Sequence, residues 1–153
     1  MITREVDYAI RTVLSLAKRG AGSVSVATAD LAKETAVPFR FLRRIIRKLV
    51  EGGILASQRG NGGGVQLTRP PDAISLLAVI AAVDGRSTKL NLCTISHANC
   101  PRSGTCRVHY ELLSLQNTLE GGLDQVTMTK LIEDGAPHNH TPYAVGEQPT
   151  AAT

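Results

Sequence analysis

Residues 38–53 read PFRFLRRIIRKLVEGG, and this stretch decides which fold the rest of the chain can adopt. Its aliphatic residues recur at helical spacing and form one stripe: Leu42, Ile45, Ile46 and Leu49. A proline suits the first turn of a helix, and the pair Gly52-Gly53 is expected to end it. The sequence therefore predicts a helix over residues 38–51 whose aliphatic side is buried.

The same helix carries its basic residues outside the aliphatic stripe. They are Arg40, Arg43, Arg44, Arg47 and Lys48. Residues 38–69 hold seven basic residues against one acid, a local charge of +6, whereas the rest of the chain carries −2. Concentrated positive charge is typical of a surface that neutralises phosphates, and an Arg-rich face turned only to water is the alternative.

Two further helices are predicted before this one. Apolar residues at helical spacing over residues 6–17 indicate the first. Thr28 is the expected N-cap of a second, short helix that runs to about Thr35. A short helix, the turn Ala36-Val37 and an Arg-faced helix together form a helix-turn-helix pattern.

A β-hairpin is predicted over residues 54–68. Apolar strand residues flank the loop RGNGGG of residues 59–64, whose glycines permit positive φ angles and a close approach of the backbone to a ligand. A phosphate-binding nucleotide loop is the rival interpretation, but no Lys-Ser/Thr pair follows the glycines and no helix opens there. We therefore expect a wing that lays Arg59 beside the DNA backbone.

Together these elements predict a winged helix-turn-helix domain over residues 1–84 that binds double-stranded DNA. Arg40, Arg43 and Arg44 are the best candidates for base or phosphate contacts, because they lie toward the N-terminal part of the Arg-faced helix. The other expected DNA-binding residues are Arg47, Arg59, Gly60, Asn61, Gly62 and Gly63.

The fold class we expect is mainly α with a small β-hairpin wing, completed by a long dimerisation helix. Because aromatic residues make up only 3% of the chain, the core must be aliphatic. An apolar helix over residues 74–83 is expected to pack under the first helix. Residues 107–134 are expected to form the dimerisation helix and a C-terminal packing segment, and residues 135–153 a disordered tail.

A coiled-coil seam is predicted on the long helix, which we expect over about residues 106–123. Its apolar residues are spaced 4, 3 and 4 apart: Val108, Leu112, Leu115 and Leu119. The seam suits pairing with a second copy of the chain, which predicts a homodimer. Packing within one chain is the alternative.

Residues 85–106 form the predicted cysteine loop, which contains all three cysteines of the chain: Cys93, Cys100 and Cys106. An odd count is a poor disulfide framework, and clustered thiols in a reducing compartment indicate metal or redox chemistry. Thiolate suits zinc or iron–sulfur iron, but Cys-x6-Cys-x5-Cys lacks the short pairs of zinc knuckles. Structural zinc, a metal-free thiol switch and unligated cysteines stay open as alternatives.

Several classes of protein are disfavoured. No apolar run approaches the roughly 18–20 residues of a membrane span, and the first residues lack the pattern of an export signal, so we expect a cytoplasmic protein without membrane contact. No nucleophile–base pair, paired-carboxylate site or nucleotide fingerprint is present, so we expect no enzyme. A cluster carrier or redox enzyme that retains a winged fold is the rival.

Three features resemble the Rrf-two family of bacterial regulators, in its iron–sulfur, IscR- and NsrR-like branch. The segment DYAIR of residues 7–11 is similar to the family's opening helix. The segment RGNGGGVQL of residues 59–67 is similar to its glycine-rich wing, which is the most specific of the motifs. The three cysteines lie where iron–sulfur members carry their ligands, although the first gap leaves the subgroup open. The resemblance covers about residues 1–134.

The resemblance implies a homodimeric repressor with one iron–sulfur cluster per subunit, of 2Fe–2S or 4Fe–4S type. The implied ligands are Cys93, Cys100 and Cys106, with either His109 or Asp7 of the partner subunit in the fourth position. His109 follows Cys106 by three residues and so shares its side of a helix. The alternative roles of Asp7 are helix capping or an ion pair with Arg11, four residues further along the first helix. The signal would be nitric oxide, oxygen, redox state or iron supply acting at the cluster.

Overall fold

The stretch that decides the fold is helical, as predicted. Helix α3 spans Phe39–Glu51 and buries its aliphatic stripe: Leu42, Ile45, Ile46 and Leu49. Pro38 is the N-cap residue, and Gly52 is the C-cap. The computed structural model describes residues 3–20, 25–58, 60, 63–84, 89–90 and 106–133.

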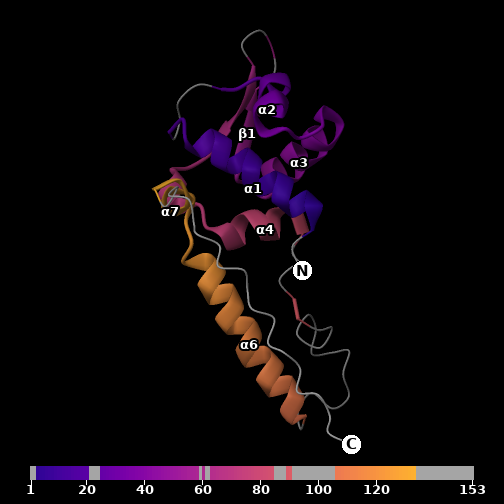
Figure 1. Ribbon diagram of the computed structural model, residues 1–153, viewed down its shortest axis with the longest axis vertical. Helices are drawn as coiled ribbons and strands as arrows, with labels where there is room; N and C mark the ends of the chain where they lie inside the picture. Colours follow the sequence, from indigo (N-terminus) through magenta and orange to yellow (C-terminus); the bar gives the residue numbers. More distant parts are fainter. Residues whose placement is uncertain are drawn as a thin grey trace, which may run out of the picture.

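The described elements form a winged-helix unit from which one long helix extends as a stalk (Figure 1). In chain order they are α1 (Arg4–Ala17), α2 (Thr28–Thr35), α3, β1 (Leu55–Gln58), β2 (Gly64–Leu67), the 3-10 turn η1 (Pro71–Ala73), α4 (Leu76–Asp84), α6 (Arg107–Asp124) and α7 (Met128–Glu133). This arrangement confirms the predicted fold class, mainly α with a hairpin wing.

The N-cap of α2 lies one residue before the predicted N-cap. Ala27, not Thr28, is the N-cap, and its carbonyl accepts a hydrogen bond from the backbone N–H of Leu31 at 3.0 Å. The cause is a contact distant in sequence: Val26 exchanges two backbone hydrogen bonds with Val65 of β2, both 2.9 Å. This bridge keeps the chain extended up to Ala27, so the helix starts immediately after it.

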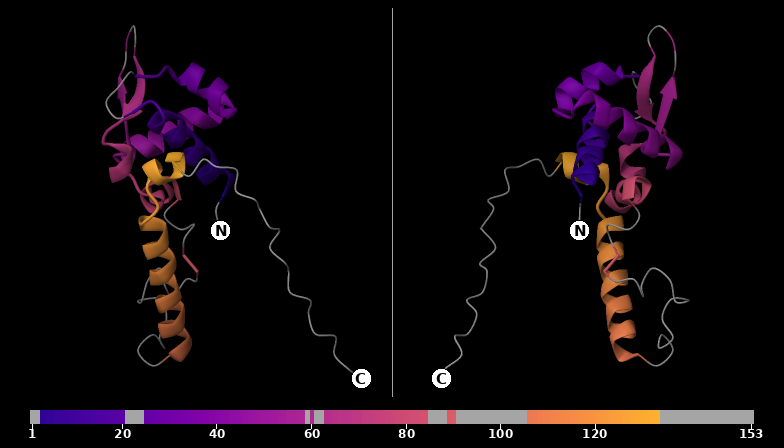
Figure 2. Two further views of the ribbon diagram at one scale, coloured as in Figure 1. Left: turned by 60° about the vertical axis from the view of Figure 1, so that its left-hand side comes forward. Right: turned by 90° about the vertical axis from the view of Figure 1, so that its right-hand side faces the viewer.

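The wing is an antiparallel hairpin in which Leu55 lies opposite Leu67 and Gln58 lies opposite Gly64. Val26 forms an isolated antiparallel β-bridge with Val65, on the side of β2 away from β1. Gly64 is required there, because a Cβ atom at this position would lie 2.3 Å from the carbonyl oxygen of Val26. The glycine-rich sequence thus serves packing as well as turning. Figure 2 shows the hairpin protruding beside α3.

The core is aliphatic, as predicted from the low aromatic content. Helix α1 packs across both α3 and α4, and the buried residues come from every described helix of the winged unit. Both phenylalanines of the chain lie outside this core, since Phe39 is 49% exposed and Phe41 is 56% exposed.

After the stalk, the chain returns to the winged-helix unit. The backbone N–H of Leu76 donates to the Val126 carbonyl at 2.7 Å, and that of Met128 donates to the Ile74 carbonyl at 2.9 Å. Met128 is fully buried in the core, and α7 packs against α1. The C-terminal end of α6 is therefore fixed to the same unit that carries α3.

Two glycine-to-alanine substitutions should change stability in opposite directions. Gly64→Ala should destabilise the protein by about 1–3 kcal/mol, because the new methyl group meets backbone rather than a movable side chain. Gly121→Ala, in α6 with open space around it, should stabilise by up to about 1 kcal/mol through helix propensity. Urea unfolding of both variants measures this, and a Gly64→Ala variant as stable as wild type would contradict the close approach.

Candidate nucleic-acid interface and metal ligands

A groove of about 300 Å³ lies between α3, the start of α2 and the wing. Arg43 and Ile46 line it from α3, and Ala27 and Thr28 line it from α2. The hairpin contributes Ser57, Gln58, Gly60, Gly63, Gly64 and Val65. The helix-turn-helix and the wing thus border one continuous hollow, which places a guanidinium next to glycine backbone.

The four arginines of α3 are all exposed, but their surroundings differ. Arg44 Nε lies 3.2 Å from Glu5 Oε1 on α1, and Arg47 Nε lies 3.2 Å from Glu51 Oε1 one turn along its own helix. Arg40 and Arg43 form no ion pair with any residue in the described part of the chain. Their guanidinium groups are therefore available to a ligand without breaking an existing ion pair.

The wing tip is only partly described. Gly60 has a φ of +109°, which favours glycine, and its carbonyl accepts a hydrogen bond from the Gly63 N–H at 2.9 Å. This hydrogen bond closes the turn beside the groove. Arg59, Asn61 and Gly62, also predicted to bind DNA, lie outside the described residues.

Two of the predicted metal ligands, Cys106 and His109, lie one turn apart at the start of α6. Cys106 is the half-buried N-cap residue, and its carbonyl accepts a hydrogen bond from the His109 N–H at 3.0 Å. The His109 side chain is only 3% exposed. Cys93 and Cys100 lie outside the described residues, and within the described ranges no three His, Cys, Asp or Glu side chains gather as a metal site would require.

Asp7 lies far from Cys106 within one chain. It belongs to α1, whereas Cys106 begins the stalk helix at the end remote from the winged-helix unit (Figure 1). Asp7 Oδ2 forms an ion pair with Arg11 at 2.9 Å, which is the alternative use foreseen for this carboxylate. A single chain therefore does not bring Asp7 to Cys106.

A stripe of apolar side chains runs along α6 in contact with water. Val108 is 63% exposed, Leu115 is 58% exposed and Leu119 is 40% exposed, while Leu112 is half-buried. The side of the helix next to this stripe is used within the chain: Gln116 Oε1 accepts a hydrogen bond from the Leu90 N–H at 2.9 Å. Packing within the described part of the chain therefore leaves the predicted seam largely uncovered.

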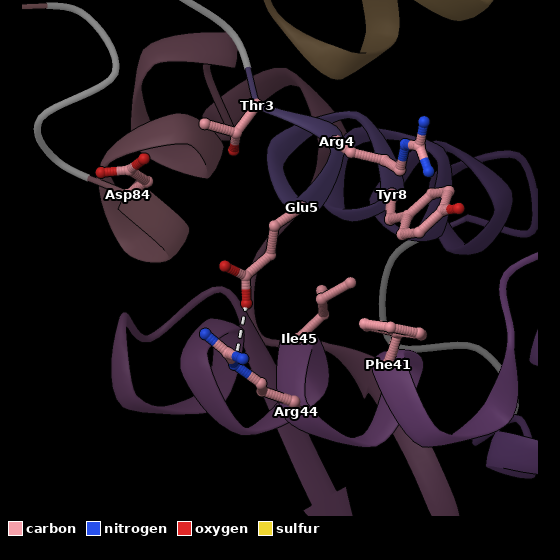
Figure 3. Close-up of a pocket in the computed structure, with 8 residues that line it drawn as sticks. All are labelled: Thr3, Arg4, Glu5, Tyr8, Phe41, Arg44, Ile45 and Asp84. Atoms are coloured by element: carbon pink, nitrogen blue, oxygen red, sulfur yellow. Dashed lines mark ion pairs between the residues drawn. The ribbon is translucent and has the colours of Figure 1, made fainter.

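Sequence reasoning missed the contact between α3 and the start of α1. Figure 3 shows a hollow, of about 380 Å³, between the two helices and the end of α4, with Glu5 and Arg44 paired across it. Tyr8 and Phe41 line the same hollow. Because Glu5 and Arg44 are far apart in sequence, no local pattern could have indicated this pairing.

The comparisons with known proteins assign the family. Residues 2–134 match the model of the Rrf2 (Rrf-two) family, described as iron-dependent transcriptional regulators. The chain belongs to the Rrf2 family. This Rrf2 protein is 28% identical over 131 residues to the transcriptional repressor NsrR of Streptomyces coelicolor, covering 86% of this chain and 87% of NsrR. It is 30% identical over 135 residues to the regulator IscR of Vibrio cholerae, covering 87% of this chain and 75% of IscR.

Solved structures support the same fold. CymR, described as the global cysteine regulator of Bacillus subtilis, superimposes with a TM-score of 0.67 at 20% identity, over 87% of this chain and 96% of CymR. The IscR of T. potens superimposes with a TM-score of 0.65 at 20% identity, over 93% of each chain.

The Rrf2 protein is thus a transcriptional regulator with DNA as its partner, and the predictions of family, fold class and non-enzymatic function are confirmed. The rival of a redox enzyme is not supported by any of these relatives. Among the described residues, no helix is both long and apolar enough to cross a bilayer.

Proposed function

We propose that this Rrf2 protein is a homodimeric repressor, acting on chromosomal DNA in the cytoplasm, whose affinity for its operator depends on an iron–sulfur cluster. The observation that carries the DNA-binding part is the groove between α3 and the wing, with Arg43 at its edge. The cluster-dependent part rests on the donor chemistry of the three cysteines and on the family.

In the proposed complex, α3 enters the major groove of one half-site. Arg40 and Arg43 share one side of the helix with Arg47 and reach base edges or phosphates, with Arg44 beside them. The wing, with Arg59 and the backbone from Gly60 through Asn61 and Gly62 to Gly63, lies along the adjacent backbone or minor groove. Arg43 and Gly60 line one hollow, which supports simultaneous contact by helix and wing.

Arg43→Met should weaken DNA binding, because it removes a guanidinium that contacts a phosphate or a base. We expect about tenfold weaker affinity, and a slope of log K against log salt that is about 0.9 shallower for each phosphate that the variant no longer neutralises. The matched control is Lys130→Met, which removes one charge from the surface of α7. Fluorescence anisotropy at several salt concentrations measures both quantities, and equal slopes for the two variants would argue against the contact.

The homodimer is proposed on the uncovered stripe of α6. Exposed aliphatic residues at coiled-coil spacing gain most by packing against their own counterparts on a second copy. Dimerisation would also allow the partner's Asp7 to approach the predicted cysteine loop. The separation between Asp7 and Cys106 within one chain does not apply between two chains. Two copies would present two α3 helices, as a symmetric operator requires.

Leu115→Asp should break the dimer, since it places a charge in the middle of the proposed seam. Asn117→Asp is the matched control: it adds the same charge two residues away, on the side of α6 turned from the seam. Sedimentation velocity should show a monomer for Leu115→Asp and a dimer for Asn117→Asp and wild type. A Leu115→Asp protein that stays dimeric would rule out this stripe as the interface.

The side chains of Cys106 and His109 fit an iron–sulfur cluster. Cys106 offers a soft sulfur ligand, and His109, one turn along the same helix, offers an imidazole with little access to bulk water. Cys93 and Cys100 would complete the thiolate set. When bound, the cluster would supply iron that reacts with nitric oxide, oxygen or reductants. The chain's own part is to hold three thiolates and to offer either His109 or the partner's Asp7 as the fourth ligand.

A metal-free thiol switch is the second candidate function. One observation favours it: a fold relative, CymR of Staphylococcus aureus, was crystallised in a form described as oxidized, with a TM-score of 0.63 at 23% identity. Structural zinc is the remaining alternative, and the same experiment separates all three.

Anaerobically purified wild-type protein should be brown or reddish and should contain iron and sulfide. Cys106→Ala should be colourless, and whichever of Asp7→Ala and His109→Ala alters the Mössbauer and visible spectra identifies the fourth ligand. The type of cluster follows from the same spectra. A colourless wild-type protein with stoichiometric zinc, or with no metal at all, would eliminate the cluster.

The sensor role is tested by the DNA affinity of the holo- and apoprotein at one salt concentration. The DNA is the duplex that the holoprotein selects from a random pool. We expect the apoprotein to bind it at least about tenfold more weakly, the scale of a typical allosteric coupling. Equal affinities would remove the sensor role but not the DNA-binding role.

A further inference from the structure

Lys48 of α3 is held inside the winged-helix unit rather than presented to a ligand. Its Nζ donates hydrogen bonds to Glu5 Oε2 on α1, at 3.0 Å, and to the Val83 carbonyl oxygen in the last turn of α4, at 2.9 Å. The side chain is 29% exposed, against 81% for Arg47 of the same helix. A single ammonium group therefore connects α3 to two other helices.

Glu5 holds a second cation of α3 as well. Its Oε1 lies 3.2 Å from Arg44 Nε, and the carboxylate is 26% exposed (Figure 3). The Val83 carbonyl belongs to the final turn of its helix, where carbonyl groups lack helical partners and a cation is favourable. Because Lys48 and Glu5 are both partly buried, their interaction is less screened by salt than the interactions of the exposed arginines.

The contacts of α3 divide its basic residues into two sets. Arg40, Arg43 and Arg47 are separated by three and four residues and share one side of the helix, on which Arg43 lines the groove beside the wing. Arg44 and Lys48 are four residues apart and share the adjacent side, turned to α1 and α4. The concentrated charge seen in the sequence is therefore not a single surface.

We propose that Lys48 and Glu5 are positioning residues for DNA recognition: they fix the angle of α3 against α1 and α4, and Lys48 contacts no phosphate. The inference rests on the proposed contact between α3 and DNA and specifies how that contact is oriented. Positioning by a partly buried hydrogen-bonded cation affects the specific complex, in which base contacts need correct register. It affects non-specific binding less, because that depends mainly on total charge.

Glu5→Gln gives the sharpest test, because it raises the net charge by one. If the basic residues of α3 acted only through charge, this variant would bind every duplex more tightly. Positioning predicts the opposite for the selected duplex: affinity about tenfold weaker, the order of magnitude for removing charge-assisted hydrogen bonds. Affinity for an unrelated duplex of the same length should be unchanged or higher, so the ratio of the two affinities falls.

Lys48→Met should produce the same decrease in specific affinity with the salt slope of wild type. Arg43→Met should lower the slope, and Lys130→Met should change neither quantity. Lys48→Arg, which can keep both hydrogen bonds, should restore most of the specific affinity. The double variant Glu5→Gln with Lys48→Met should lose less affinity than the sum of the two single losses, because both substitutions remove the shared Lys48–Glu5 interaction.

The measurements use the full-length, anaerobically purified protein and two duplexes, over a range of salt concentrations. Two results would overturn the inference: a Lys48→Met slope as shallow as that of Arg43→Met, or a Lys48→Met protein identical to Lys130→Met throughout. An unfolded Lys48→Met leaves the test to Glu5→Gln, and tighter specific binding by that variant also overturns it. If Arg43→Met keeps the wild-type slope, the failure is that of the proposed DNA contact, whatever Lys48 does.

Discussion

The burial of one aliphatic stripe determines how everything else in this molecule is oriented. Leu42, Ile45, Ile46 and Leu49 are all buried, so α3 has only one rotational setting about its axis that satisfies the core. That setting turns Arg40 and Arg43 outward, with Arg43 beside the wing. Without the buried stripe, nothing would fix the direction in which these arginines point.

Much of the fold could be predicted because its signals are local. The helical period of α3, the glycines of the wing and the spacing of the α6 stripe are each contained in a short segment of sequence. Such local patterns are enough to predict a helix or a hairpin. The boundaries of α3 and α6 differ from the predicted ones by a single residue at the ends.

The features that the sequence did not predict depend on contacts between residues far apart in the chain. Ala27 caps α2 because Val26 pairs with Val65. The Lys48 side chain turns toward α1 and α4 because Glu5 and the Val83 carbonyl accept its hydrogen bonds. The charge pattern alone placed Lys48 with the exposed arginines of α3. For the candidate metal site, the sequence named the donors Cys106 and His109, and the structure places them one turn apart at the start of α6. Whether Asp7 joins them depends on a second chain.

The stalk has a mechanical consequence. Helix α6 has 18 residues, which at 1.5 Å each makes it about 27 Å long. Its C-terminal end is tied to the winged-helix unit, because Ser75 Oγ donates a hydrogen bond to Asp124 Oδ1 at 2.7 Å. The helix is therefore a lever arm with its fulcrum next to the winged unit. A tilt of about 5° at that fulcrum displaces the far end, where Cys106 lies, by about 2 Å over such a length. Movements too small to break a hydrogen bond at one end become movements of a bond length or more at the other.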